Sequence, residues 1–126
     1  ETVGERQHYI KMQGSDVFKF AVRIMEDATK RILAKAGLEK DEVRWVIPHQ
    51  ANTRIISAAA ARLGICEDRF FINVDRYGNT SAASIGLALD ELARSGELKT
   101  GDYVVMVGFG AGLTWSALLL KWYREA

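Results

Sequence analysis

The stretch from Trp45 to Ile55 constrains the fold more than any other, because it has the pattern of a strand, a turn and a helix in immediate succession. Val43 to Ile47 is short, apolar and rich in β-branched residues, which is typical of a buried strand. Pro48 lacks an amide hydrogen and so predicts the end of that strand's hydrogen-bond ladder. His49 is therefore predicted at the carboxyl end of a strand, where functional groups of α/β proteins gather.

Predicted helices and strands alternate along the chain. The helices are expected over Ser15–Ala36, about Asn52–Leu63 and about Ser81–Arg94, ending at Gly37, Gly64 and Ser95-Gly96. The strands are expected over Val43–Ile47, Phe70–Val74, Tyr103–Val107 and Leu113–Trp122. This alternation predicts one α/β domain over residues 1–126, with a mixed, mostly parallel sheet that ends in two apolar strands.

His49 is followed by a helix start, which Asn52 or Thr53 can cap. The partial positive charge at that helix terminus disfavours protonation of the imidazole, so a neutral His49 is expected. A lone histidine is more often structural than catalytic, and its position alone leaves both roles open.

Asn79 is predicted to repeat the placement of His49, after the strand Phe70–Val74 and before a helix start. Its neutral amide offers two hydrogens that can point at a developing anion, while Thr80 or Ser81 is left to cap the helix. The alternative is an ordinary turn asparagine after glycine.

A third feature is the glycine-rich segment 108–112, predicted as a turn between the last two strands. It is not a dinucleotide-binding fingerprint, because no helix follows it to receive a pyrophosphate. The glycines are instead expected to let backbone amides approach a ligand.

Together these features resemble the carboxyl-terminal half of β-ketoacyl-acyl carrier protein synthase III, a family of thiolase-like condensing enzymes. The resemblance runs from about Tyr9 through Trp122 and rests on the segments 10–14, 17–19, 49–52, 75–84 and 108–110, in that order. It implies condensation of an acyl-coenzyme A primer with malonyl-acyl carrier protein, which releases carbon dioxide and initiates fatty-acid synthesis. It also implies a half-fold with a five-stranded mixed sheet, paired with a similar half. The strands would lie near Tyr9, Val46, Phe71, Val105 and Leu118.

The resemblance gives roles to the residues singled out above. His49 and Asn79 would donate hydrogen bonds to the malonyl thioester oxygen as it becomes an enolate. The backbone amide of Ala111, where the family often has glycine, would stabilise a tetrahedral oxyanion. Phe109 matches a gating aromatic residue that favours loss of the carboxylate as carbon dioxide.

Lys19, Arg54 and Arg62 match a basic patch that docks the acidic carrier protein, with Arg54 as the leading candidate. Asn52 matches a position that contacts the pantetheine arm, and helix capping competes with that role. Ser15 stands where many relatives have asparagine, which weakens any coenzyme A contact there.

The implied mechanism needs a cysteine that holds the primer as a thioester. Cys66, the only cysteine, follows a helix terminator and precedes two acids, whose negative charge disfavours a reactive thiolate, so we interpret it as structural or incidental. The family nucleophile belongs to an amino-terminal half that is expected to lie outside these residues. No metal or cofactor is expected, and coenzyme A and phosphopantetheine thioesters would be substrates.

Composition fits a soluble enzyme domain, with 126 residues, 48% apolar content and 17 basic against 16 acidic side chains. That balance provides no field for nucleic acid or membranes. No apolar run approaches the roughly 20 residues of a membrane span, and Glu1 to Gln7 has no signal-peptide character. A cytoplasmic location is expected, and a homodimer is expected from the resemblance.

Two alternatives stay open at this point. A related condensing enzyme of polyketide or other secondary metabolism would carry the same residues and differ in the primer it accepts. A non-catalytic module that binds a carrier protein or completes a dimer is the other, because no nucleophilic cysteine is apparent.

Overall fold

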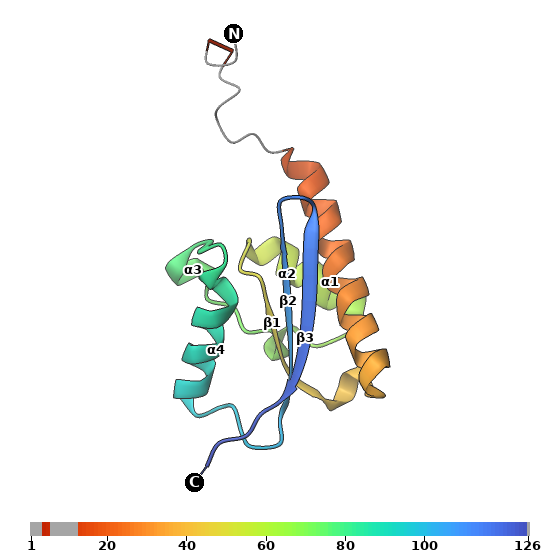
Figure 1. The fold of residues 1–126 in the computed structure, drawn as a ribbon, viewed down its shortest axis with the longest axis vertical. Helices are drawn as coiled ribbons and strands as arrows, with labels where there is room; N and C mark the ends of the chain where they lie inside the picture. Colours follow the sequence, from red (N-terminus) through yellow and green to blue (C-terminus); the bar gives the residue numbers. More distant parts are fainter. Residues whose placement is uncertain (1–3, 6–12, 126) are drawn as a thin grey trace.

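The computed structural model describes residues 4–5 and 13–125. Its helices are α1 (Gly14–Ala36), α2 (Thr53–Leu63), α3 (Val74–Tyr77) and α4 (Ala83–Ser95), and its strands are β1 (Val43–Pro48), β2 (Tyr103–Gly110) and β3 (Thr114–Lys121). The described strands form one mixed sheet in the order β1-β2-β3, with β1 and β2 parallel and β2 and β3 antiparallel (Figure 1). The predicted mixed α/β fold, ending in two apolar strands, is confirmed. The described sheet has three strands, with one parallel and one antiparallel pairing, so the expected excess of parallel pairing is not seen among them.

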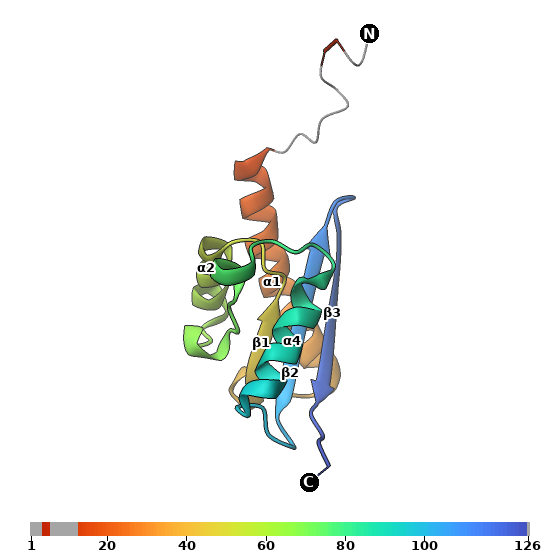
Figure 2. The same cartoon turned by 90° about the vertical axis from the view of Figure 1, so that its left-hand side faces the viewer.

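The sheet lies between two helical layers, with α1 and α2 on one face and α4 on the other (Figures 1 and 2). Successive residues of β1 and β2 alternate between the faces, as strand geometry requires. The side chains packed with α1 and α2 are Val46, Val105 and Val107, and those packed with α4 are Trp45, Ile47 and Val104. Two apolar clusters, one on each face, therefore hold the sheet in place.

The long helices follow the sequence predictions closely. Gly37 and Gly64 adopt the left-handed conformation after α1 and α2, which ends each helix where a glycine was expected. Asn52 caps α2 by accepting a hydrogen bond from the Ile55 amide at 3.0 Å. The cap expected from Thr80 or Ser81 is wrong, because Ala82 is the N-cap of α4 and has no side-chain hydrogen bond.

The predicted strand over Phe70–Val74 is wrong. In the described chain this segment meets β1 only through an isolated parallel bridge between Val46 and Phe70. The Phe71 amide donates to the Val46 carbonyl at 2.9 Å, and the next bond of a parallel ladder would need an amide hydrogen on residue 48. Pro48 has none, so the segment leaves the sheet and continues into α3. A further predicted strand, near Tyr9, lies outside the described residues.

Pro48 does not end the pairing on the other side of β1. It remains in register with Val107 of β2, and the His49 amide then donates to the Val107 carbonyl at 2.7 Å. The backbone of His49 is therefore fixed to the central strand.

The glycine-rich segment is also corrected by the structure. Gly108 and Gly110 belong to β2, where they pair with Ser116 and Thr114 of β3, and the turn occupies residues 111–113. Antiparallel pairing along all of β2 outweighs the usual preference of glycine for turns.

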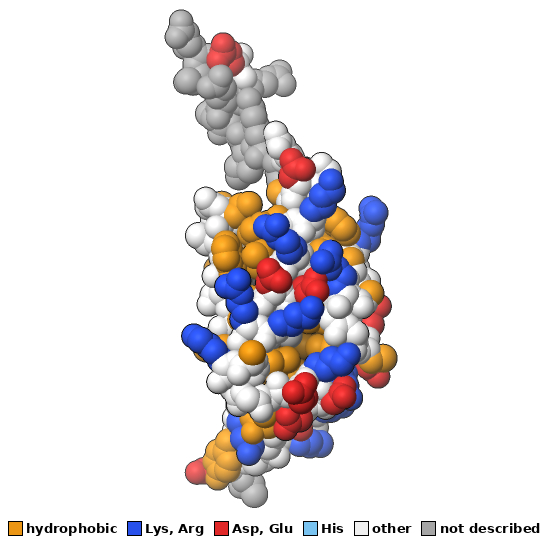
Figure 3. All heavy atoms as spheres, turned by 90° about the vertical axis from the view of Figure 1, so that its right-hand side faces the viewer, with side chains coloured by type: hydrophobic (Ala, Val, Ile, Leu, Met, Phe, Trp, Pro, Cys, Tyr) orange, Lys and Arg blue, Asp and Glu red, His pale blue; other side chains and the backbone are white. Residues whose placement is uncertain are grey.

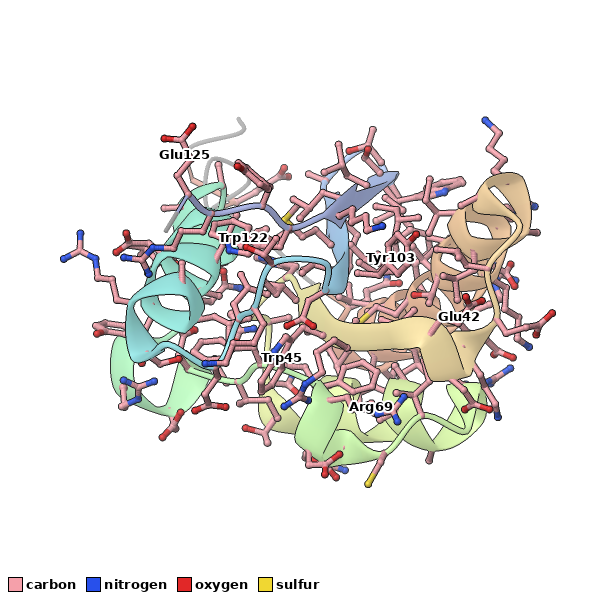
Figure 4. The ribbon with its side chains drawn as sticks, turned by 90° about the horizontal axis from the view of Figure 1, so that it is seen from below. Glu42, Trp45, Arg69, Tyr103, Trp122 and Glu125 are labelled. Carbon is pink, nitrogen blue, oxygen red and sulfur yellow. The ribbon has the colours of Figure 1, made fainter. Side chains whose placement is uncertain are left out.

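The end of the molecule where β1 and β2 begin is closed by side chains (Figure 4). Arg69 donates to the Val43 carbonyl at 3.2 Å, and the Trp45 ring meets Phe71 edge-on with 6.3 Å between centroids. The opposite end of the sheet, beyond Pro48, carries the candidate site.

Candidate active site

A hollow of about 600 Å³ opens at the carboxyl end of β1, between the start of α4 and the β2–β3 hairpin. Four residues singled out from the sequence line it together: His49, Asn79, Phe109 and Ala111. The remaining lining residues are Ser81, Ala82, Ile85, Gly108, Gly110, Thr114, Trp115 and Ser116. The structure thus brings the two predicted hydrogen-bond donors to one concave surface.

His49 follows the last residue of β1 and is half-buried. Burial lowers the pKa of its imidazole from the ordinary value, which agrees with the neutral state expected from sequence. The ring of Phe109 stands edge-on to it, with 5.1 Å between centroids and 87° between planes. Within the described chain neither imidazole nitrogen has a hydrogen-bond partner, so the ring's one N–H can meet a substrate oxygen.

Asn79 reaches the hollow by a different route from the one predicted. It follows α3 rather than a strand, and Gly78 turns the chain toward it with φ 70° and ψ −164°, a conformation that glycine alone adopts readily. The Asn79 Oδ1 accepts the Ser81 amide hydrogen at 3.0 Å. That bond commits the oxygen to the backbone and leaves the Nδ2 hydrogens to face a ligand.

Ser81 has φ 52°, in the left-handed region that residues other than glycine, asparagine and aspartate rarely adopt. Just beyond it, the Thr80 and buried Ser84 hydroxyls share a hydrogen bond of 3.1 Å. This bent backbone tightens the loop that presents Asn79 at the start of α4.

The wall opposite α4 is formed by the end of β2 and the hairpin turn. Gly110 has no heavy atom within 4 Å of where a Cβ would lie, and a Cβ at Gly108 would meet only the Ile85 side chain at 3.5 Å. The glycines beside Phe109 therefore leave the strand backbone bare toward the hollow. Ala111 is exposed in the turn, and its carbonyl accepts the Thr114 hydroxyl at 3.0 Å.

Gln50 was missed by the sequence analysis. It lies directly after His49, is 1% exposed, and uses its side-chain amide in four hydrogen bonds to backbone groups. The sequence signal for this role is that Gln50 lies two residues after Pro48, which has no amide hydrogen to donate to a neighbouring carbonyl.

The residues predicted to dock a carrier protein lie outside the hollow, on α1 and α2. Figure 3 faces α1 and shows Lys and Arg side chains spread along it with Asp and Glu among them. Lys19 and Arg54 are exposed, and the Arg54 guanidinium lies 5.9 Å from the centre of the Phe18 ring. Asn52, beside Arg54, is exposed and uses its side-chain oxygen in the α2 cap.

Arg62 differs from Arg54 because it already has a partner. Its guanidinium bonds to Glu26 of α1 at 2.5 Å, and Lys30 bonds to the same carboxylate at 2.7 Å. Both hydrogen bonds lower the pKa of the Glu26 carboxyl, and the bond from Lys30 has the larger effect. Arg62 also lies about 12 Å further along α2 than Arg54. Of the three predicted docking residues, Arg62 is therefore the one whose charge is already paired with an acidic side chain.

Cys66 is exposed and precedes the short 3₁₀ helix Glu67–Arg69, away from the residues that line the hollow. Its interpretation as structural or incidental stays a prediction. No helix within residues 4–5 and 13–125 has the length and apolar character needed to cross a membrane.

Comparison with known proteins places this arrangement in a family. The model described as 3-oxoacyl-[acyl-carrier-protein (ACP)] synthase III C terminal matches residues 33–122, and the chain belongs to that family. The match covers β1 with His49, the Asn79 loop and the β2–β3 hairpin.

Individual relatives agree. A β-ketoacyl-[acyl-carrier-protein] synthase III of Desulfitobacterium hafniense is 60% identical over 99% of this chain, which spans 38% of that protein. The structure of β-ketoacyl-[acyl carrier protein] synthase III from Thermus thermophilus matches with a TM-score of 0.87 and 55% identity, over 90% of this chain and 35% of that one. A priming β-ketosynthase from a polyketide biosynthetic pathway matches with a TM-score of 0.77 and 43% identity, over 88% and 34%. The chain thus spans less than two-fifths of each.

Proposed function

We propose that this chain is the carboxyl-terminal catalytic part of an enzyme that condenses an acyl-coenzyme A primer with malonyl-acyl carrier protein to begin fatty-acid synthesis. The observation that carries the proposal is the meeting of His49 and Asn79 in one hollow, within a chain of the synthase III family. Neither residue has a thiol that could hold the primer as a thioester, so we propose that the nucleophilic cysteine comes from elsewhere in the enzyme.

In the proposed reaction, the bond between the malonyl carboxylate and the α-carbon breaks and carbon dioxide leaves. The electron pair moves onto the thioester oxygen, giving an enolate. The His49 N–H and the Asn79 Nδ2 hydrogens stabilise this oxygen most once it carries negative charge, which is the requirement for lowering the barrier.

Two other groups complete the proposed site. The enolate α-carbon attacks the acyl-cysteine thioester, whose carbonyl oxygen then carries negative charge that the Ala111 amide stabilises. The tetrahedral intermediate collapses, expels the cysteine thiolate and leaves the β-ketoacyl product on the carrier protein. The Phe109 ring beside His49 presents an apolar surface that disfavours the charged carboxylate and favours its loss as carbon dioxide.

The proposed partners are acyl carrier protein, acyl-coenzyme A and an amino-terminal half that carries the cysteine. Coenzyme A and phosphopantetheine thioesters serve as substrates, and the chemistry described needs no metal or cofactor. The same family resemblance is our basis for proposing a homodimer in the cytoplasm.

A chimaeric synthase tests the function directly. In it, this sequence replaces the matching 125 residues of the Desulfitobacterium hafniense enzyme, which supplies its own amino-terminal half. We expect the purified chimaera to form acetoacetyl-carrier protein from acetyl-coenzyme A and malonyl-acyl carrier protein, measured by mass spectrometry. A folded chimaera that binds the carrier protein but never forms this product would favour the non-catalytic module.

Docking of the carrier protein is tested by Arg54→Glu in the chimaera. We expect the KM for malonyl-acyl carrier protein to rise about five- to tenfold at low salt, because steering of an acidic partner depends on exposed positive charge. The KM for acetyl-coenzyme A should change little. The effect should shrink with added salt, since exposed charges are screened over about 10 Å at 0.1 M.

Arg31→Glu is the matched control for that variant. Arg31 is also exposed, and it lies about 18 Å along α1 from Lys19. The same charge reversal there should leave both KM values near those of the parent. Equal damage to both substrates by Arg54→Glu, independent of salt, would place Arg54 in a shared arm-binding tunnel instead.

A priming condensing enzyme of polyketide synthesis is the second candidate, favoured by the 43% identity to such a β-ketosynthase. Both candidates use the same chemistry at His49 and Asn79. They differ in the acyl primer, so the kcat/KM of the native full-length enzyme for primers of different length and branching separates them.

A further inference from the structure

We propose that Gln50 is a positioning residue that fixes the Asn79 loop relative to His49. The inference rests on the proposed function, because the distance between these two donors matters only if both bind one enolate oxygen. The observations behind the inference do not depend on that function. They are the hydrogen bonds of the buried Gln50 side chain, which is not among the residues that line the hollow.

The first step is the unmet bond at the edge of β1. The Phe71 amide donates to the Val46 carbonyl, and a parallel ladder would next bring the residue 48 amide to the Phe71 carbonyl. Pro48 cannot supply that hydrogen. The Gln50 Nε2 donates to the Phe71 carbonyl at 3.0 Å and so takes the place of the missing backbone amide.

The second step is the saturation of the Gln50 amide. Its other Nε2 hydrogen is directed to the Pro48 carbonyl at 3.0 Å, and its Oε1 accepts the Asn73 and Val74 amides at 2.9 and 3.1 Å. A primary amide has two hydrogens and two lone pairs, and all four are used. Because the side chain is buried, losing any of these bonds leaves a polar backbone group without water.

The third step connects this anchor to Asn79. Asn73, itself 2% exposed, donates from Nδ2 to Glu91 of α4 at 3.3 Å, and Arg76 of α3 forms an ion pair with the same carboxylate. Gln50 therefore holds the start of α3, and Glu91 fastens α3 to α4. Asn79 lies in the short loop between these two helices, so its position relative to His49 depends on both attachments.

The test uses the chimaeric synthase and measures its two half-reactions separately. Gln50→Met keeps the length of the side chain and removes all four hydrogen bonds. We expect kcat for malonyl decarboxylation to fall about 10- to 100-fold, since small misplacement of catalytic groups has effects of this size. Primer transfer to the cysteine and the KM for malonyl-acyl carrier protein should stay near the parent values.

Leu33→Ala is the control for general destabilisation, because Leu33 is a buried core residue near the far end of α1. It should lower both half-reactions together, in proportion to the folded fraction measured by circular dichroism. The inference is overturned if Gln50→Met decarboxylates at the parental rate per folded molecule, or if it loses both half-reactions in proportion as Leu33→Ala does.

A milder pair of variants keeps the inference testable if Gln50→Met does not fold. Glu91→Ala removes the link between α3 and α4, whereas Asp90→Ala removes only the neighbouring exposed pair with Arg94. We expect decarboxylation to slow about threefold or more in Glu91→Ala alone. Equal rates in the two variants would overturn the inference. Unimpaired decarboxylation in His49→Ala would instead overturn the proposed function, whatever Gln50 does.

Discussion

His49→Ala and Asn79→Ala, each introduced into the chimaeric synthase, are expected to lower malonyl decarboxylation by about 100- to 1000-fold. Removing one preorganised donor to a developing oxyanion costs about 2.7 to 4 kcal/mol of barrier. Both side chains line the hollow. Within the part of the chain that the structure describes, neither the His49 ring N–H nor the Asn79 Nδ2 group donates a hydrogen bond to another residue. Both donors are therefore available to a ligand oxygen, and each is expected to contribute to the stabilisation of its charge.

The same variants should still accept a radiolabelled primer on the cysteine, because His49 and Asn79 act after that transfer. Primer attachment and carbon dioxide release are measured on the same samples, so poor folding would reduce both. A variant that lost primer attachment while decarboxylating normally would show that we have assigned its role to the wrong half-reaction.

The second large effect concerns the 126-residue chain by itself. We expect no condensing activity from it, and we expect activity when an amino-terminal half carrying the cysteine is supplied. Donors such as His49, Asn79 and the Ala111 amide can stabilise an enolate or an oxyanion, but none can hold the primer as a thioester. Slow decarboxylation of malonyl thioesters is the most that the chain should achieve.

Cys66 is the residue through which this expectation could fail. After incubation with acetyl-coenzyme A, mass spectrometry should find the Cys66 thiol unmodified, and a Cys66→Ser chain should behave in the same way as the parent. Acetylation of Cys66 followed by turnover to an acetoacetyl product would contradict the expectation, and would also contradict the interpretation of this exposed thiol as incidental.

The parts of the fold that follow local chemistry were predictable from sequence. Apolar spacing in α1, the Asn52 cap and the glycines that end α1 and α2 act within a few residues of one another. For the same reason His49 was placed correctly, since a β-branched run followed by proline marks the end of a strand.

The errors arose where one segment depends on a distant one. Phe70–Val74 has the composition of a strand, but pairing with β1 would need an amide hydrogen on residue 48. Pro48 has none, so only an isolated bridge forms. Gly108 and Gly110 are typical of a turn, but in the structure both belong to β2 and pair with residues of β3. Gln50 escaped notice because its hydrogen bonds reach residues 71–74, and no periodicity records such a contact.

The pairing of a proline with a nearby glutamine has a consequence for how this sequence can drift over generations. Any residue at position 48 that carries an amide hydrogen could offer the Phe71 carbonyl the bond that Gln50 now provides. One of the four contacts made by Gln50 would then become redundant, and a mutation at position 50 would be less harmful. Pro48 and Gln50 thus form a coupled pair, in which the history of one position alters which changes natural selection tolerates at the other.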